Sequence, residues 1–132
     1  MSSLIVAGFV FLHGAIHLSF LAPTPPAMAD GPAWPFDLHG SWLLARSDTS
    51  QRFARPLGLA LTAVTFATFT LAAMAIVGLA PHVVGDAFVV LGAGSSMALL
   101  MLFFHPWLVL GLVIDIALLW AASIAGWAPP PV

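Results

Sequence analysis

The chain has 132 residues, of which 61% are hydrophobic and only 6% carry a charge. Soluble domains carry about 25% charged residues, so these charges are too few to cover a water-facing surface. The formal net charge of −2 predicts no nucleic acid among the partners, and the absence of cysteine excludes disulfides, thiolate metal sites and cysteine nucleophiles. With a mean hydropathy of +1.09, the composition predicts an integral membrane protein.

Four apolar runs are each long enough to cross a membrane, which takes about 20 residues of helix. Runs of this length without alternation of polar and apolar residues exclude strands, and lipid admits only helices or closed barrels. We therefore predict an all-α fold, a single four-helix membrane bundle over residues 1–132. Its helices are expected at about 4–22, 53–80, 83–104 and 107–127.

The segment 23–56, between the first two runs, is the only sizeable polar stretch. Leu38, Trp42 and Ala45 follow one another in it at helical spacing, which predicts a short helix lying in the membrane interface. Its end reads "SDTS" (47–50), and these residue types favour the N-cap of the second helix. Pro56 is then expected in the first turn of that helix, where proline is tolerated.

The orientation in the membrane follows from arginine. Arg46, Arg52 and Arg55 all lie in the 23–56 loop, and the chain has no lysine. Positively charged residues are enriched in cytoplasmic loops. We therefore expect this loop in the cytoplasm and both termini outside.

Five ionisable side chains form a predicted buried polar cluster, which is a candidate ligand site. His13 and His17 lie in the first run, Asp115 in the fourth, His105 at the turn between the third and fourth runs, and His39 in the loop. Ionisable residues within a membrane are costly and are functional candidates by default. The first two are one helical turn apart, so they share a face of the helix.

Depth in the membrane brings part of this cluster together. At 1.5 Å per residue, His13 lies roughly 14 Å and His17 roughly 8 Å from the cytoplasmic end of the first helix. Asp115 lies roughly 12 Å from the same side in the fourth helix. A lone aspartate in hydrocarbon is unfavourable, whereas beside a histidine it accepts a hydrogen bond or forms an ion pair. We predict that His13 or His17 contacts Asp115.

Three roles for the cluster stay open. The first is interhelical hydrogen bonding without chemistry, worth about 0.6 kcal/mol on average per bond in membranes and up to about 1–2 kcal/mol. The second is a metal site of His13, His17 and Asp115, with His39 or His105 as a fourth ligand for zinc or non-haem iron. Haem could bind through His13, His17 or His105. The third is an acid–base enzyme that moves a proton on a lipid-like substrate.

Three stretches resemble an uncharacterised family of short bacterial four-helix membrane proteins of about this length. They are "FLHGAIHLSFLAP" (11–23), which holds the family's His-Gly-x-x-His pattern, "RPLGLALTA" (55–63) and "HPWLVLGLVIDIALL" (105–119). The resemblance implies the same fold in the bacterial inner membrane. The chain departs from the family in lacking Trp-Pro-Asp before the last helix, and in having Asp115 where relatives tend to have asparagine, which bonds a histidine without titrating.

The small size of the bundle predicts an accessory or interaction subunit of a larger membrane assembly. Such a subunit contacts the lipid bilayer and either other membrane subunits or a second copy, and a lipid, quinone or pigment is a candidate ligand. The alternative is a membrane protein that binds metal or haem, or performs acid–base chemistry, through the buried His/Asp cluster. The sequence leaves open whether the protein is an enzyme and whether it needs a cofactor.

Overall fold

The computed structural model describes residues 2–25 and 33–124. Within them the chain forms four α-helices and no strand: α1 (Ser2–Ile16), α2 (Asp48–Ile76), α3 (Gly85–Leu102) and α4 (Val109–Ser123). Three short 3₁₀-helices adjoin them: η1 (His17–Leu21) continues α1, while η2 (His82–Val84) and η3 (Pro106–Leu108) precede α3 and α4. The 4 resulting segments are long and apolar enough to cross a membrane, which confirms the predicted all-α fold.

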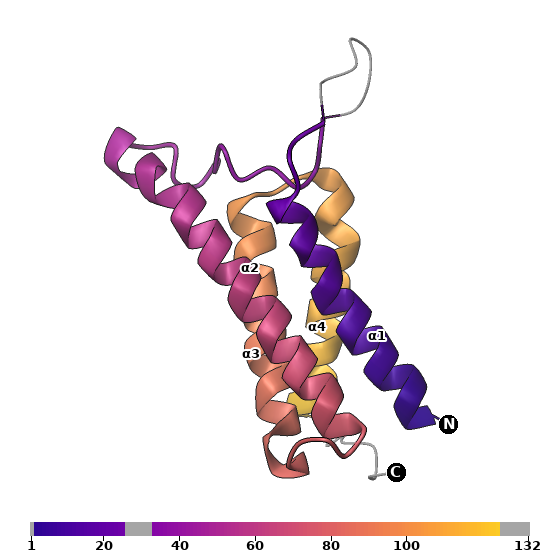
Figure 1. The fold of residues 1–132 in the computed structure, drawn as a ribbon. Coiled ribbons are helices and arrows are strands. Elements are labelled where there is room, and N and C mark those ends of the chain that lie inside the picture. The colour runs from indigo at the N-terminus through magenta and orange to yellow at the C-terminus, as the bar shows by residue number, and fades with distance from the viewer. Residues whose placement is uncertain (1, 26–32, 125–132) are drawn as a thin grey trace.

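The helices run alternately up and down, so the N-terminus and the end of α4 lie at one end of the bundle (Figure 1). We call this the terminal end, and the opposite end, which carries the segment 33–47, the loop end. Helix α2 packs against α1 and α3, and α3 packs against α4. The backbones of α1 and α4 approach each other much less closely, so side chains make most of the contact between them.

Helix α2 begins at Asp48, earlier than hydropathy predicts. The N-cap is Ser47, one of the expected candidates, whose hydroxyl accepts the backbone N–H of Ser50 at 3.1 Å. The expectation that Pro56 lies in the first turn is therefore wrong, because this proline lies inside the helix. A proline there removes one backbone donor from the helix. The other helices lie close to the predicted ranges, and 125–127 of the predicted fourth helix fall outside the described residues.

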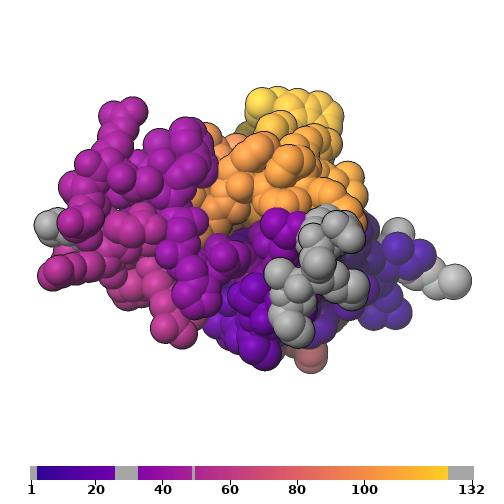
Figure 2. Space-filling model, turned by 90° about the horizontal axis from the view of Figure 1, so that it is seen from above, coloured from indigo at the N-terminus to yellow at the C-terminus, as the bar shows by residue number. Residues whose placement is uncertain are grey.

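The predicted interfacial helix in the loop is absent from residues 33–47, which form bends and a turn at 42–46. Instead, the Ser41 hydroxyl donates to the carbonyl of Leu102 at 2.6 Å, and the Trp42 Nε1–H donates to that of Met101 at 2.7 Å. These carbonyls belong to the last turn of α3 and have no partner within the helix. The loop therefore caps α3, and Figure 2 shows it across the loop end, beside the α3–α4 connection.

Two apolar clusters fill the bundle, one toward each end. The terminal cluster consists of Ala7, Val10, Phe69, Ala72, Ala73, Ile76, Val89, Ala93 and Leu118. The loop cluster consists of Phe20, Leu38, Ala54, Leu99, Leu100, Phe103 and Leu108. A polar layer lies between the two clusters, and it contains the candidate site.

Phe69 occupies the centre of the helix packing. A Cβ atom on Gly14 of α1 would lie 2.7 Å from the Phe69 Cβ, and one on Gly92 of α3 would lie 2.9 Å from its ring. Real Cβ atoms do not approach neighbours this closely, so both positions require glycine for α1 and α3 to close on the aromatic ring. This packing sets the position of His13, the neighbour of Gly14.

Candidate functional site

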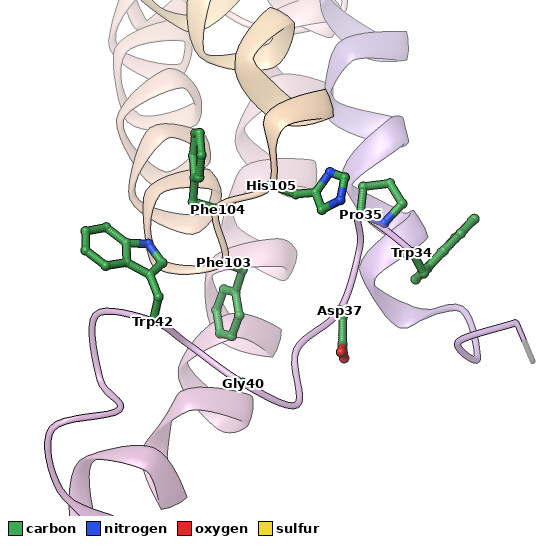
Figure 3. Close-up of a pocket in the computed structure, with 8 residues that line it drawn as sticks. All are labelled: Trp34, Pro35, Asp37, Gly40, Trp42, Phe103, Phe104 and His105. Carbon is green, nitrogen blue, oxygen red and sulfur yellow. The ribbon is translucent and has the colours of Figure 1, made fainter. Parts of the chain in front are cut away.

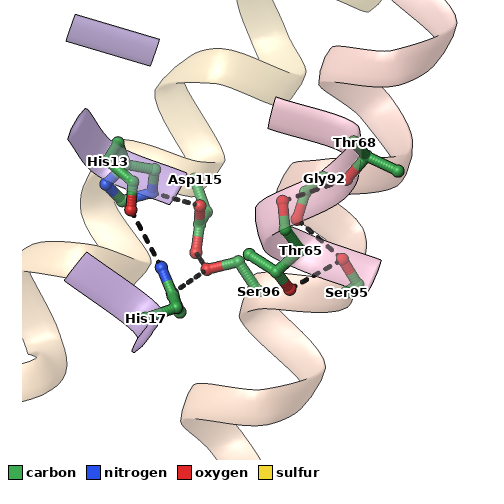
Figure 4. A network of polar contacts seen from close by, with 8 residues as sticks. All are labelled: His13, His17, Thr65, Thr68, Gly92, Ser95, Ser96 and Asp115. Carbon is green, nitrogen blue, oxygen red and sulfur yellow. Dashed lines mark hydrogen bonds and ion pairs between the residues drawn. The ribbon is translucent and has the colours of Figure 1, made fainter. Parts of the chain in front are cut away.

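Four polar side chains meet in the layer between the two apolar clusters (Figure 4). They come from three of the four membrane-capable segments, because η1 continues α1. His13 comes from α1, His17 from η1, Ser96 from α3 and Asp115 from α4. The exposed fraction is 0% for Ser96 and Asp115, 2% for His17 and 7% for His13. The site is thus enclosed by protein, and its polar atoms must find their partners within the bundle.

The four side chains form a closed chain of hydrogen bonds, which we call the His–Asp–Ser network. The His13 Nε2 lies 2.8 Å from Asp115 Oδ1, and the Ser96 hydroxyl oxygen lies 2.5 Å from Asp115 Oδ2. The same hydroxyl oxygen lies 2.7 Å from His17 Nε2. The His17 Nδ1–H donates to the backbone carbonyl of His13 at 2.9 Å, which closes the chain. The predicted contact between the first helix and Asp115 is present, through His13.

Local structure and packing fix the two imidazole rings. The helix changes from α to 3₁₀ at His17, whose side chain bonds the carbonyl four residues before it. The His13 ring packs edge-on against Phe69, with centroids 5.2 Å apart, and is stacked with Phe9 at 6.3 Å. Edge-to-face and stacked contacts of this kind hold a ring in one orientation. The His13 ring is therefore directed at Asp115 by its neighbours.

Counting hydrogens constrains the charge of the network. Each of its four contacts needs one hydrogen between the two atoms, and the His13 carbonyl carries none. Two neutral imidazoles and one hydroxyl supply one hydrogen each, and a carboxylate supplies none. Making all four hydrogen bonds at once therefore takes one proton beyond this set, shared among coupled groups and not assigned to one residue. With that proton its net charge is zero, as burial in an apolar bundle favours.

A second group of polar side chains joins α2 to α3 beside the network. Thr65 Oγ1 lies 2.9 Å from Ser95 Oγ, which itself donates to the carbonyl of Gly92 at 3.0 Å (Figure 4). The Ser95 hydrogen is thus used, so Thr65 is the donor in the contact between the two hydroxyls. Thr62 donates to the carbonyl of Gly58 in its own helix at 2.9 Å. The hydrogen bond between Thr65 and Ser95 therefore joins α2 to α3, in addition to the His–Asp–Ser network.

The other two histidines of the predicted cluster lie at the loop end and do not join the network. The imidazole of His39 is 72% exposed and its Nδ1 lies 2.6 Å from Asp37 Oδ1. The His105 Nδ1 accepts the backbone N–H of Trp107 at 3.3 Å and so caps η3. Partial burial acts to raise the pKa of Asp37, but hydrogen bonds from the His39 amide and imidazole, together with the His39 charge, outweigh it and lower that pKa.

Sequence reasoning did not identify Ser96, which bonds both His17 and Asp115. It lies in "GAGSS" (92–96), a stretch that suggests close helix packing rather than a polar site. A usable signal was present: Ser96 is six residues before the end of α3 at Leu102, roughly 9 Å deep, close to the expected depth of His17. The depth comparison that found Asp115 would also have found this hydroxyl.

The nitrogen and oxygen atoms of the site are arranged for hydrogen bonding to one another. In the part of the chain that the structure describes, no three His, Asp or Glu side chains are grouped so as to hold a metal ion. Both ring nitrogens of His17 and one of His13 bond to protein atoms. A metal or haem iron on His13, His17 or Asp115 would have to replace at least one of these bonds or use the remaining His13 Nδ1. The predicted metal or haem role of these residues stays a prediction.

Fold and site together define a small α-helical protein with four membrane-capable segments, three of which are joined by a buried polar network. No family model, curated protein or solved structure matches the chain. The resemblance to short bacterial membrane proteins stays an expectation.

Proposed function

We propose that this protein is an accessory subunit of a membrane assembly, which associates with other transmembrane helices through the outer face of α3. In this proposal the His–Asp–Ser network is the internal lock that makes the four helices one rigid unit. The partner helices belong to another membrane protein or to a second copy of this chain.

A stripe of residues along the outer face of α3 supports this proposal. All its members are exposed, and successive members are four, three, four and three residues apart: Ala87, Leu91, Gly94, Ala98 and Met101. This is the spacing of a helix seam that packs against a partner helix. The middle of the seam is small, which lets two backbones approach closely in a membrane, where tight packing drives association.

Gly94 is the observation that carries the proposal. A Cβ atom added there meets nothing within 4 Å, whereas Cβ atoms at Gly14, Gly58 and Gly92 would collide with side chains of the bundle. Packing within the chain therefore explains these three glycines but neither Gly94 nor Gly8 of α1, and of these two only Gly94 has a small residue, Ala98, four positions along its helix. Glycine costs about 1 kcal/mol relative to alanine inside a helix. Close contact with a partner helix would offset this cost and explain a glycine at position 94.

The test compares two exposed glycines that lack internal contacts, Gly94 of α3 and Gly8 of α1. The particle mass of the wild type and of Gly94→Leu and Gly8→Leu would be measured in discs of native membrane. We expect the wild type and Gly8→Leu in an assembly heavier than the monomer, and Gly94→Leu released as a folded monomer. A wild type that is monomeric in native lipid, or a Gly94→Leu variant that stays assembled, would refute the proposal.

A second candidate function is acid–base chemistry or proton transfer within the membrane, and the additional proton of the network favours it. The second ring nitrogen of His13, Nδ1, lies on the side away from Asp115 (Figure 4) and forms no hydrogen bond with the described residues. A proton arriving there can pass through the ring to Asp115. Proton flux into vesicles carrying the wild type, absent with Asp115→Asn, would support this function; equal flux would exclude it.

We also infer that the loop end faces the cytoplasm of a bacterial inner membrane. Arg46, Arg52 and Arg55 are all exposed and lie in the loop or the first turns of α2. The positive-inside rule then assigns the orientation, and the terminal end faces outside.

A further inference from the structure

The loop end carries an open pocket that the proposed function does not use. It lies between the 34–42 segment and the α3–α4 connection and has a volume of about 210 Å³ (Figure 3). Its lining includes four aromatic side chains, one imidazole and one carboxylate: Trp34, Trp42, Phe103, Phe104, His105 and Asp37. One membrane-capable segment ends at Leu102 and the next begins at Pro106, so the pocket lies at the ends of two such segments.

Asp37 gives the pocket its charge. Among the described residues it is the only acidic one that lines the pocket, and no arginine lines it. Its Oδ1 accepts both the amide and the imidazole of His39, at 2.9 and 2.6 Å, while Oδ2 bonds to no described residue. The hydrogen bonds that lower the pKa of Asp37 keep the carboxylate ionised at neutral pH. One carboxylate oxygen is thus charged, held in place and free to take a partner.

The aromatic walls are held by the same contacts that cap α3. The Trp42 indole donates to the Met101 carbonyl, and the neighbouring Ser41 donates to Leu102. Phe103 is only 4% exposed and its ring lies 6.4 Å from that of Phe20. Phe104 is 48% exposed and makes no ring contact of this kind with the described residues. The pocket is therefore anchored to the loop cluster of the core and presents an exposed aromatic ring.

We propose that this pocket binds an organic ammonium group, carried by the headgroup of an amine lipid or by a free small amine. Asp37 is the counter-ion, and the aromatic side chains attract the cation through their ring faces. Aromatic walls around a cation are the recognised means of binding quaternary ammonium ligands. The volume of about 210 Å³ is below that of sites for drug-sized ligands, about 300–1,000 Å³, and so fits a headgroup.

The probe is choline, and its control is the uncharged carbon isostere in which a tert-butyl group replaces the trimethylammonium group. Binding to the full chain would be measured by calorimetry in discs of phosphatidylglycerol, a lipid without an amine. We expect saturable choline binding, and an affinity for the isostere at least about ten-fold weaker, because only the charge differs. Equal binding of the two ligands, or no saturable binding of choline, would overturn the proposal.

Two pairs of variants locate the site. Asp37→Asn keeps an oxygen that can accept both His39 bonds but removes the charge, so we expect choline affinity to fall at least about ten-fold. Asp86→Asn, at the terminal end of α3, is the matched control and should change nothing. Phe104→Leu should weaken binding by about three-fold or more while Phe104→Trp preserves it. Unchanged affinity in folded Asp37→Asn would overturn the proposal.

The source of the ammonium group is decided by changing the lipid. If the natural ligand is a headgroup, adding phosphatidylethanolamine to the discs should raise the apparent Kd for choline by competition. If it is a free amine, the Kd should stay the same. Either result keeps the ammonium site and selects its ligand.

Discussion

Replacing Asp115 with leucine or with asparagine separates the packing role of this residue from its proton. Leucine has the same branching at Cγ, although it is larger, and it removes both carboxyl oxygens. The His13 Nε2 and the Ser96 hydroxyl then each lose the partner they have at 2.8 and 2.5 Å. Because α1 and α4 approach each other mainly through side chains, the variant also loses the main polar tie between these helices.

The cost of Asp115→Leu follows from one orphaned group, the His13 Nε2–H, because the Ser96 hydroxyl still donates to His17 Nε2. A buried polar group without a partner costs about 1–3 kcal/mol, while interhelical bonds measured in membranes average about 0.6 kcal/mol. Asp115 is fully buried, so little water is available for repair, and we expect a loss of about 1–3 kcal/mol in the free energy of unfolding.

Asp115→Asn should behave differently, because its amide supplies the missing hydrogen. The side-chain oxygen accepts from His13, the NH₂ group donates to Ser96, and the Ser96 hydroxyl donates to His17. All four contacts are made with neutral imidazoles and no additional proton. We expect its stability at pH 7 to lie within about 1 kcal/mol of the wild type, even though a charged residue type has been replaced.

Equilibrium unfolding in mixed micelles, followed by tryptophan fluorescence, measures the stability of the wild type and of both variants.

If Asp115→Asn destabilises the protein as much as Asp115→Leu, the hydrogen bonds counted for Asp115 do not stabilise the bundle.

Three further predictions concern other parts of the chain. Gly14→Ala places a Cβ 2.7 Å from the Phe69 Cβ and should lower the free energy of unfolding by about 1–3 kcal/mol in the micelle assay. Gly8→Ala, in open space on the same helix, should raise it by up to about 1 kcal/mol. A cysteine at exposed Gly40 should react with a membrane-impermeant thiol reagent only from the cytoplasmic face; labelling from outside would reverse the orientation. The Asp37 carboxyl, followed by the NMR shift of its labelled carbon, should stay ionised down to a pH below the usual aspartate range, because the hydrogen bonds from His39 lower its pKa; protonation at or above that range would contradict this.

The sequence predicts the four spans and the partner of Asp115 because both depend on one-dimensional quantities. Hydropathy and length define a span, and the rise of 1.5 Å per residue defines depth, which placed His13 and Asp115 level. The same rule would have included Ser96 had hydroxyls been considered beside ionisable groups. What depth cannot give is the direction of a ring, which depends on Phe69 and on the change to 3₁₀ geometry at His17.

The errors arise where contacts distant in sequence override a local pattern. The helical spacing of Leu38, Trp42 and Ala45 predicts an interfacial helix, but Trp42 bonds the end of α3, 59 residues away, and the segment follows that contact. Hydropathy likewise places the start of the second helix too late, because the Ser47 cap begins α2 in a polar stretch before the apolar run. The pocket around Asp37 depends on the same long-range capping of α3.

The most direct test of the account is a measurement of the His–Asp–Ser network itself, by solid-state NMR on isotope-labelled protein in lipid bilayers. We predict a through-space contact between the His13 ring and the Asp115 carboxyl carbon, and a His17 ring with hydrogen on Nδ1. Both imidazoles should be rigid, and the His13 contact should vanish in Asp115→Leu. Mobile imidazoles without a contact to Asp115 would contradict the central claim that a buried network joins α1, α3 and α4.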